Sequence, residues 1–259
     1  MLMALPTRAD LVSLLFGLCV GTQMIILRAS GMGGCLSVAS NAAKTLAAAL
    51  NKPLVGVHHM QAHALTPILT APESDHPQFP FLTLLVSGGH TLLLLATSLT
   101  SFRILATTAD ESVGHAFDMV SRRLKISWLG MGPGAALEQF CATDDRGIEL
   151  PAIDLSFSHP MPGELGFSYS GLHSAVERYI TARGGVQNLD FPTKLALARA
   201  FQTAAVFQLV DKLRLGLKWC ERHNKQIGHI VVSGGVASNT FLRERSVIAF
   251  EMICAIFCD

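Results

Sequence analysis

Hydrophobic positions along the chain change repeatedly between helical and strand spacing, which predicts a protein built from both elements. Helical periodicity is clearest in the long run that starts at Phe191-Pro192-Thr193, where the proline suits a first helical turn. Apolar runs of six residues on either side of Ser87 to His90 indicate a hairpin. The predicted helices are at about 37–50, 172–182 and 191–222, and the predicted strands at 54–57, 81–86, 91–96 and 230–232. This alternation favours the α/β class.

The first 30 residues form an atypical apolar leader. The stretch from Leu11 to Leu27 is almost uncharged, and its length is at the short limit for a membrane span. Gly17, Gly21 and Gln23 argue against such a span. A misassigned or replaced amino terminus is the favoured interpretation, with a signal or anchor second. We therefore expect no stable membrane insertion.

His59 and His63 form a potential metal-binding pair. They lie four residues apart, directly after the predicted strand 54–57, so that a helix would place both imidazoles on one face. Histidine is the commonest metal ligand near neutral pH. The zinc-protease pattern has Glu after the first histidine, whereas this chain has Met60, which argues against peptidase chemistry by that route. A third ligand, typically a carboxylate, would have to come from elsewhere; two surface histidines that bind nothing are an equal alternative.

A near-repeat ends two of the predicted strands. Leu84 to His90 and Ile230 to Val236 are both apolar runs that lead into Ser-Gly-Gly. Glycine pairs let a backbone approach a ligand closely and direct N–H groups at an anion. Two such turns suit a nucleotide held between two halves of a fold, although ordinary turns explain them about as well. Asn239 is a plausible N-cap for the segment that follows the second turn.

Composition supports a globular protein and excludes a strong electrostatic field over the whole molecule. Hydrophobic residues make up 50% of the 259 residues and charged residues 15%, and the net charge is +1. Nucleic-acid binding would therefore depend on local patches such as Arg122-Arg123-x-Lys125, for which a solvated helix face is the simpler reading. The 6 cysteines show no repeated Cys-x-x-Cys spacing, which is typical of a reducing compartment and argues against a structural zinc finger.

Several motifs together resemble one family. They are, in order, His-His-Met-x-x-His (58–63), Leu-Val-Ser-Gly-Gly-His-Thr (85–91), Gly-His-Ala-Phe-Asp (114–118), Gly-Phe-Ser-Tyr-Ser-Gly-Leu-His (166–173) and Ser-Gly-Gly-Val-Ala-Ser-Asn (233–239). Their order and spacing are similar to those of the tRNA threonylcarbamoyladenosine transferases, once misnamed sialoglycoprotein endopeptidases. The resemblance covers residues 31–239, and Asn51 to Met60 most resembles the mitochondrial branch.

The resemblance implies an actin-like ATPase fold of two α/β lobes around a nucleotide cleft, incomplete here. It also implies an acyltransferase that moves a threonylcarbamoyl group from its adenylate to the adenosine beside the tRNA anticodon. His59 and His63 match two of three ligands of one divalent ion, Fe or Zn. The substrate-binding positions that match are Leu85, Val86, Ser87, Gly88, Gly89, Asp118, Gly134, Glu138, Ser238 and Asn239. No separate catalytic residue is assigned. The implied partners are tRNA, threonylcarbamoyl-adenylate and a second copy or a partner subunit. The implied location is mitochondrial, with the cytoplasm as alternative.

Both ends depart from the family pattern. The family opens with a strand and a phosphate-binding turn rich in Ser, Cys and Asp, which residues 1–30 do not match. Its third metal ligand is an Asp in a Thr-Asp-Asn-Gly run well beyond Asn239, and residues 240–259 read as a divergent tail. We therefore expect a truncated member with impaired transfer. The alternatives are an inactive binding partner of an intact subunit and a small-molecule kinase of the same actin-like fold. Taken alone, Asp118 and Glu138 would read as solvated helix carboxylates.

Overall fold

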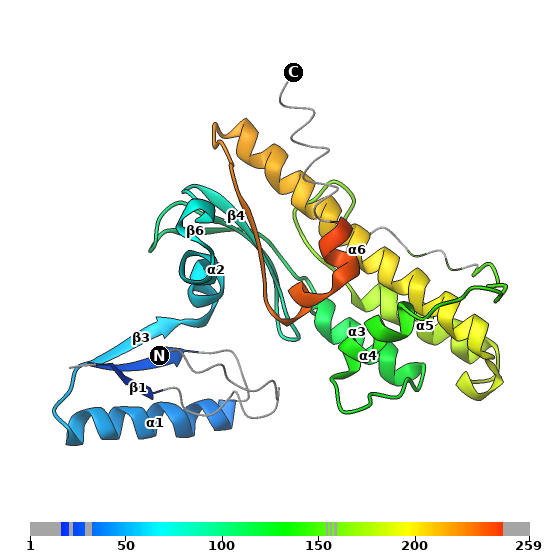
Figure 1. The fold of residues 1–259 in the computed structure, drawn as a ribbon, viewed down its shortest axis with the longest axis horizontal. Helices are drawn as coiled ribbons and strands as arrows, with labels where there is room; N and C mark the ends of the chain where they lie inside the picture. The colour runs from blue at the N-terminus through cyan, green and yellow to red at the C-terminus, as the bar shows by residue number, and fades with distance from the viewer. Residues whose placement is uncertain are drawn as a thin grey trace. The chain divides into compact units, whose positions relative to one another are not determined.

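The fold is known from a computed structural model, which describes residues 17–20, 23–28, 33–153, 155, 157 and 160–245. The chain divides into two compact units, residues 1–69 and residues 70–259. Figure 1 traces the chain through both, and each unit is described by itself.

The first unit is a three-stranded sheet with helices in its connections. It comprises β1 (Gly17–Val20), β2 (Gln23–Arg28), α1 (Gly33–Ala49), β3 (Leu54–His58) and α2 (His59–Thr70), which ends at the division between the units. The sheet order is β1-β2-β3, with β1 antiparallel to β2 and β2 parallel to β3. Helix α1 is the crossover connection between the parallel strands β2 and β3, and its Ala43 and Ala47 are buried against Leu54.

Strand β2 and helix α2 bear on two of the sequence predictions. The described residues of the apolar leader are strand rather than helix, since Gly17–Val20 and Gln23–Arg28 pair with each other. The rest of the leader lies outside the described residues. Over the part of the chain that the structure describes, no helix is long and apolar enough to cross a membrane. The predicted change from strand to helix at His59 is confirmed, because β3 ends at His58 and α2 begins at the next residue.

The second unit contains a four-stranded sheet of order β6-β5-β4-β7. Its strands are β4 (Phe81–Val86), β5 (Thr91–Ala96), β6 (Phe102–Thr107) and β7 (Ile230–Ser233). The hairpin β4–β5 has the predicted bounds, and β7 lies parallel to β4 with Leu85 opposite Ser233. Strand β6 is not among the strands predicted from the sequence. Its pairing with β5 is interrupted by a bulge at Leu93/Leu94, and Ile104 is exposed at this sheet edge, so strict alternation is lost.

Within the described residues, the helices that accompany this sheet are α3 (Val113–Arg123), α4 (Pro133–Cys141), α5 (Ser170–Ala182), α6 (Phe191–Arg222) and a helical segment at 240–245. Short 3₁₀ turns are η1 (Glu73–Asp75), η2 (Val186–Asn188) and η3 (Gly235–Ser238). Helix α6 has the predicted bounds because Asp190 caps it, accepting a hydrogen bond from the Thr193 N–H, and Pro192 occupies its first turn. In Figure 1, α3, α4 and α5 gather beside one half of this long helix.

The core of the second unit lies between the sheet and these helices. Every residue of β4 and β5 is buried, which explains why their sequences are continuous apolar runs. Phe117 of α3 packs edge-on against Phe201 of α6, with ring centroids 5.2 Å apart. Gly216 lets α6 approach β5, because a Cβ at this position would lie 2.4 Å from Leu93 Cδ2.

We expect Gly234→Ala to lower the free energy of unfolding by at least about 2 kcal/mol. Gly234 has φ 105°, and a Cβ there would lie 2.2 Å from the Val86 carbonyl oxygen, so the side chain would push β7 away from β4. Gly235 is the matched control, because a Cβ there meets nothing within 4 Å. Gly235→Ala should change the stability by less than about 0.5 kcal/mol. Urea unfolding followed by circular dichroism measures both, and equal midpoints would contradict the close approach.

Candidate nucleotide site at the ends of β4 and β7

The turn between β4 and β5 presents main chain to solvent beside the end of a buried strand. The Ser87 N–H donates to the His90 carbonyl at 2.8 Å, and the Ser87 hydroxyl accepts from the His90 N–H at 3.0 Å and the Gly89 N–H at 3.3 Å. Gly88 and Gly89 are exposed, and neither would bring a Cβ within 4 Å of another group. The turn is thus held by its own serine while its glycines leave open space above them.

Helix α3 begins directly against this turn. The Ser112 hydroxyl caps the helix by accepting from the His115 N–H and donates to the Gly88 carbonyl at 2.6 Å. Gly114, in the first helical turn, permits the contact, since a Cβ there would lie 2.6 Å from the Ser87 carbonyl oxygen. The N-terminal end of a helix carries partial positive charge and N–H donors. A glycine turn beside a helix N-terminus is chemistry that suits an anion such as phosphate.

The second Ser-Gly-Gly turn lies next to the first. Because β4 and β7 are parallel, their carboxyl ends meet at one sheet edge, and Gly234 packs on Val86 there. Turn η3 follows and brings Asn239 into a buried position, where its side-chain oxygen accepts from the Leu242 N–H at 2.9 Å. The predicted N-cap role of Asn239 is confirmed, and residues 240–245 are helical.

Two carboxylates join helices α3 and α4 to the segment after η3. Asp118 Oδ1 accepts from the Gly134 N–H at 2.8 Å, at the first turn of α4. Glu138, one turn further along α4, accepts through Oε1 from the Thr240 N–H at 2.7 Å and from its hydroxyl at 2.9 Å. Main-chain donors therefore hold one oxygen of each carboxylate, and Asp118 Oδ2 and Glu138 Oε2 make no hydrogen bond within the described residues.

The structure thus gathers the sequence-predicted residues of the second unit around one sheet edge. Leu85 and Val86 are fully buried, so that only their main chain could face a ligand. Ser238 is exposed, and its hydroxyl donates to the Gly235 carbonyl at 2.8 Å. Pro133 is the first residue of α4 rather than part of a free turn, which places Gly134 in a helical N-terminus beside Asp118.

His59 and His63 lie in the other unit, on the first two turns of α2. Both are half-buried, and their rings meet edge to face with centroids 4.4 Å apart. Two ring nitrogens on one helix face fit part of a metal site, because structural and catalytic sites need three or four ligands. Within the described ranges, no group of three or more His, Cys, Asp or Glu side chains gathers where it could hold an ion.

An acidic pair just before α3 was missed by the sequence analysis. Asp110 accepts hydrogen bonds from the Ser168 hydroxyl at 2.6 Å, from the Tyr169 N–H at 3.0 Å and from Ser170. Partial burial alone would raise the pKa of Asp110, but these hydrogen bonds outweigh it and lower the pKa to about 2. Glu111, next to it, contacts the imidazoles of His173 and, at 3.6 Å, His115.

These contacts explain why the motif at 166–173 lies near the site. Its Phe167 N–H donates to the Thr107 carbonyl at 3.0 Å, which anchors it beside β6. Asp110 and Glu111 then tie its serines and histidine to the start of α3. The signal in the sequence was the pairing of Asp-Glu before one motif with Ser-Tyr-Ser and His in another, but only the fold shows that they meet.

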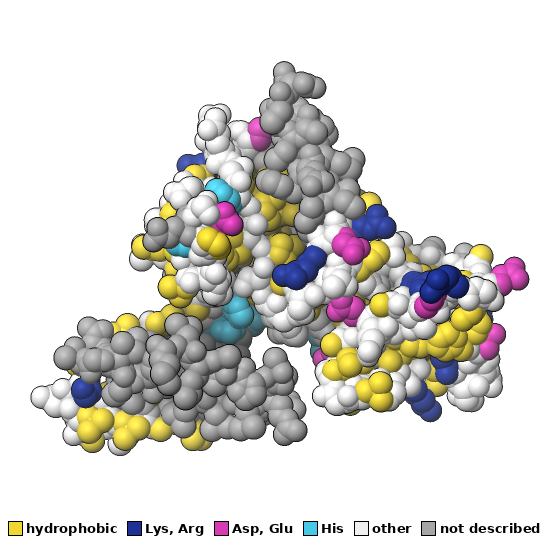
Figure 2. Space-filling model, in the orientation of Figure 1, with side chains coloured by type: hydrophobic (Ala, Val, Ile, Leu, Met, Phe, Trp, Pro, Cys, Tyr) yellow, Lys and Arg dark blue, Asp and Glu magenta, His cyan; other side chains and the backbone are white. Residues whose placement is uncertain are grey.

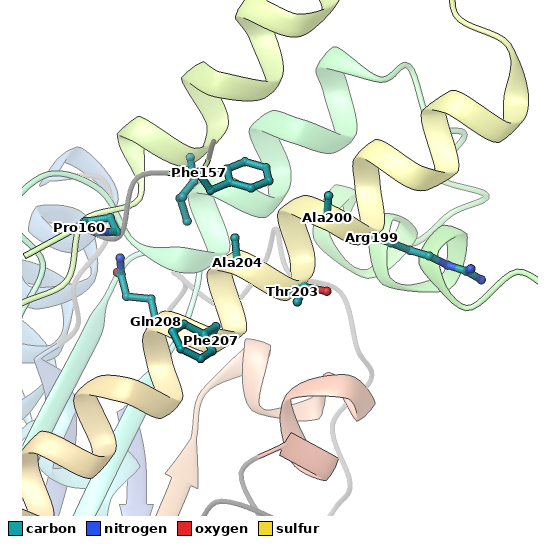
Figure 3. A pocket seen from close by; sticks show the side chains of 9 residues that line it. Phe157, Pro160, Arg199, Ala200, Thr203, Ala204, Phe207 and Gln208 are labelled. Carbon is teal, nitrogen blue, oxygen red and sulfur yellow. The ribbon is translucent and has the colours of Figure 1, made fainter. Parts of the chain in front are cut away.

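A groove lies elsewhere, along α6. It has a volume of about 510 Å³ and is lined by Phe157, Pro160, Leu172, Arg199, Ala200, Thr203, Ala204, Phe207 and Gln208. Figure 3 shows the small side chains of α6 facing Phe157 and Pro160 across it. Arg199 is engaged by the Cys141 and Thr143 carbonyls and Asp145. None of the sequence-predicted residues lines this groove, so it does not contribute to the site at the sheet edge.

Comparison with known families gives a match over most of the chain. The family described as TsaD, tRNA N6-adenosine threonylcarbamoyltransferase, matches residues 29–258. This range contains both Ser-Gly-Gly turns, both histidines and both carboxylates discussed above.

Curated relatives agree with this match. The chain is 36% identical over 231 residues to the probable mitochondrial tRNA N6-adenosine threonylcarbamoyltransferase of Arabidopsis thaliana, covering 83% of this chain and 45% of that protein. It is 38% identical over 226 residues to the mitochondrial enzyme of Schizosaccharomyces pombe, covering 85% and 51%. Against the enzyme of Methylobacillus flagellatus the identity is 36% over 216 residues, covering 83% and 58%. The chain thus spans about half the length of these relatives.

Among solved structures, an activator of the 2-hydroxyisocaproyl-CoA dehydratase from Clostridium difficile is similar at 13% identity with a TM-score of 0.45, covering 76% of this chain and 59% of that one. The α/β class is confirmed by the two sheets and their helices, and the actin-like arrangement of two lobes stays a prediction. By the extent of its sequence match, the chain belongs to the tRNA N6-adenosine threonylcarbamoyltransferase family.

Proposed function

We propose that the protein takes part in N6-threonylcarbamoyladenosine synthesis, transferring the threonylcarbamoyl group from its adenylate to the adenosine beside the anticodon of a tRNA. The observation that carries the proposal is the family match over residues 29–258 together with the meeting of Gly88, Gly89, Asp118, Glu138 and Asn239 at one sheet edge. Some relatives are named as mitochondrial, which supports a mitochondrial location.

The reaction is an acyl transfer. A bond forms between the carbamoyl carbon and the exocyclic nitrogen of adenosine, the bond from that carbon to the adenylate oxygen breaks, AMP leaves, and the nitrogen loses a proton. The exposed backbone of Gly88 and Gly89 would let the phosphate approach closely, and the partial positive charge of the α3 N-terminus would stabilise the charge of the leaving AMP. Asp118 Oδ2 and Glu138 Oε2, the oxygens not used by main chain, would accept from ribose hydroxyls.

His59 and His63 would supply two ligands of one divalent ion, Fe or Zn. Such an ion polarises a carbonyl group as a Lewis acid. The protein's own contribution there is the α2 first turn, which sets the two imidazoles one helical turn apart on one face.

Charge distribution bears on how an RNA partner would be recognised. Figure 2 shows Lys and Arg side chains interspersed with Asp and Glu on this face of the described residues rather than gathered in one field. With a net charge of +1, association with tRNA would depend on local groups.

The proposed transfer is tested with purified protein, threonylcarbamoyl-adenylate and unmodified tRNA, read by nucleoside mass spectrometry. We expect N6-threonylcarbamoyladenosine above the background without protein, and a loss of at least about tenfold in Asp118→Asn, because one ribose acceptor is weakened. Adenylate that binds but never yields the modified nucleoside would contradict transfer and favour an inactive binding partner. ATP turnover with a small-molecule acceptor would instead favour a kinase.

Gly89→Asp should weaken AMP or adenylate binding about tenfold, because a carboxylate beside the phosphate adds repulsion of about 1 kcal/mol or more. The fold should tolerate the change, since a Cβ at Gly89 meets nothing within 4 Å. Gly228→Asp is the matched control, as Gly228 has the same open surroundings but precedes β7. Calorimetry measures both variants, and tight binding that survives Gly89→Asp would show that the turn does not face the phosphate.

The double variant His59→Ala, His63→Ala should lose the divalent metal that the wild-type protein retains weakly after gel filtration with added Zn²⁺ or Fe²⁺. Removing two nitrogen donors leaves no named protein ligand for the ion. His223→Ala, at an exposed histidine beyond the last turn of α6, is the control and should keep the wild-type content. Metal analysis by mass spectrometry that gives equal, stoichiometric metal in all three proteins would place the site elsewhere.

A further inference from the structure

The connection between α3 and α4, residues 124–132, projects from the base of the candidate site. Its base is held by the hydrogen bond between the Gly134 N–H and Asp118, which joins the middle of α3 to the first turn of α4. A turn within it is held by the Met131 N–H, which donates to the Trp128 carbonyl at 2.8 Å. Whatever this connection contacts is therefore held at a fixed place relative to Asp118.

Its tip exposes large apolar side chains. Trp128 is 41% exposed and Leu129 is 79% exposed. The Arg122 guanidinium lies over the Trp128 ring, 5.5 Å from the centroid. A single exposed apolar residue is ordinary, but an exposed indole with a guanidinium beside it is the pairing on which nucleobases stack.

The same segment is locally basic. Between Asp118 and Glu138 the sequence has three basic residues and no acidic one; they are Arg122, Arg123 and Lys125. Arg123 is compensated by Glu177 at 3.1 Å, whereas Arg122 and Lys125 form no ion pair within the described residues. On a chain whose net charge is +1, this is a local concentration of positive charge beside an aromatic ring.

We propose that the α3–α4 connection is an RNA-contact element: Trp128 stacks on an unpaired base, and Arg122 and Lys125 contact flanking phosphates. The inference rests on the proposed function, since it names the surface that would hold the acceptor tRNA close to Asp118. An unpaired base is required because bases in a duplex are already stacked. An acidic protein partner would use the same cations but would not need the indole ring, and the test separates the two.

The test is fluorescence anisotropy with a labelled anticodon stem–loop RNA and the 259-residue protein. Trp128→Ala should raise the dissociation constant about tenfold, and Trp128→Phe should restore most of the affinity, because stacking depends on an aromatic face. Lys125→Glu should weaken binding and reduce the magnitude of the salt slope by about 1. Lys218→Glu, at an exposed lysine on α6, is the matched charge control and should bind like wild type.

Each outcome decides the proposal. Equal affinities for wild type and Trp128→Ala overturn it, and so does binding that responds to Lys125→Glu alone, since that is the behaviour of a charge-only contact. Absence of RNA binding in the wild type also overturns it. AMP binding, measured on the same Trp128→Ala sample, should match wild type; if it does while RNA binding fails, the adenylate site stands without this RNA surface, whereas loss of AMP binding in the wild type counts against the proposed function itself.

Discussion

The parallel pairing of β4 with β7 is the constraint on which the site depends. Leu85 lies opposite Ser233, so two Ser-Gly-Gly turns from positions about 145 residues apart in the sequence end at the same sheet edge. The pairing is close enough that Gly234 has no room for a side chain beside the Val86 carbonyl. Strand β4 is fully buried and strand β7 is partly buried. The position of both turns is therefore a consequence of core packing.

Hydrogen bonds between side chains and main-chain groups then attach the rest of the site to this edge. Ser112 links the start of α3 to Gly88, Asp118 links α3 to α4, and Glu138 links α4 to Thr240. Asp118 and Glu138 each use one carboxylate oxygen for these structural bonds, and the other oxygen is available for a ligand. A site built this way is preorganised, because its polar groups are already oriented before a substrate arrives.

The connection between α3 and α4 is held by one of the hydrogen bonds of the candidate site. The Asp118 hydrogen bond that shapes the candidate ribose contact also closes the base of the segment that carries Trp128. Positive charge and an aromatic ring are thus positioned by a residue of the candidate site. Under the proposed RNA contact, a chain with little net charge would recognise RNA through these local groups.

Much of the fold could be predicted from the sequence, because the responsible signals are local. The hairpin β4–β5 and helix α6 have the predicted bounds, since continuous apolar runs, a turn of glycines, and Asp190 with Pro192 determine them within a few residues. Strand β6 could not be predicted, because a bulge and an exposed edge remove its alternation. The motif residues could be named from the family resemblance, but their contacts could not.

By itself, the sequence determined the helices α1, α5 and α6, the strands β3, β4, β5 and β7, the family resemblance and the identities of the candidate ligands. Only the tertiary structure decided which of them meet: that Gly114 packs on the turn of Ser87, that Asp110 reaches Ser168 and Ser170, and that Glu138 receives Thr240. The reason is physical. Helix caps and turns depend on neighbours in the chain, whereas these contacts join segments 27 to 102 residues apart, and only the packing of helices on a particular sheet order brings such segments within hydrogen-bonding distance.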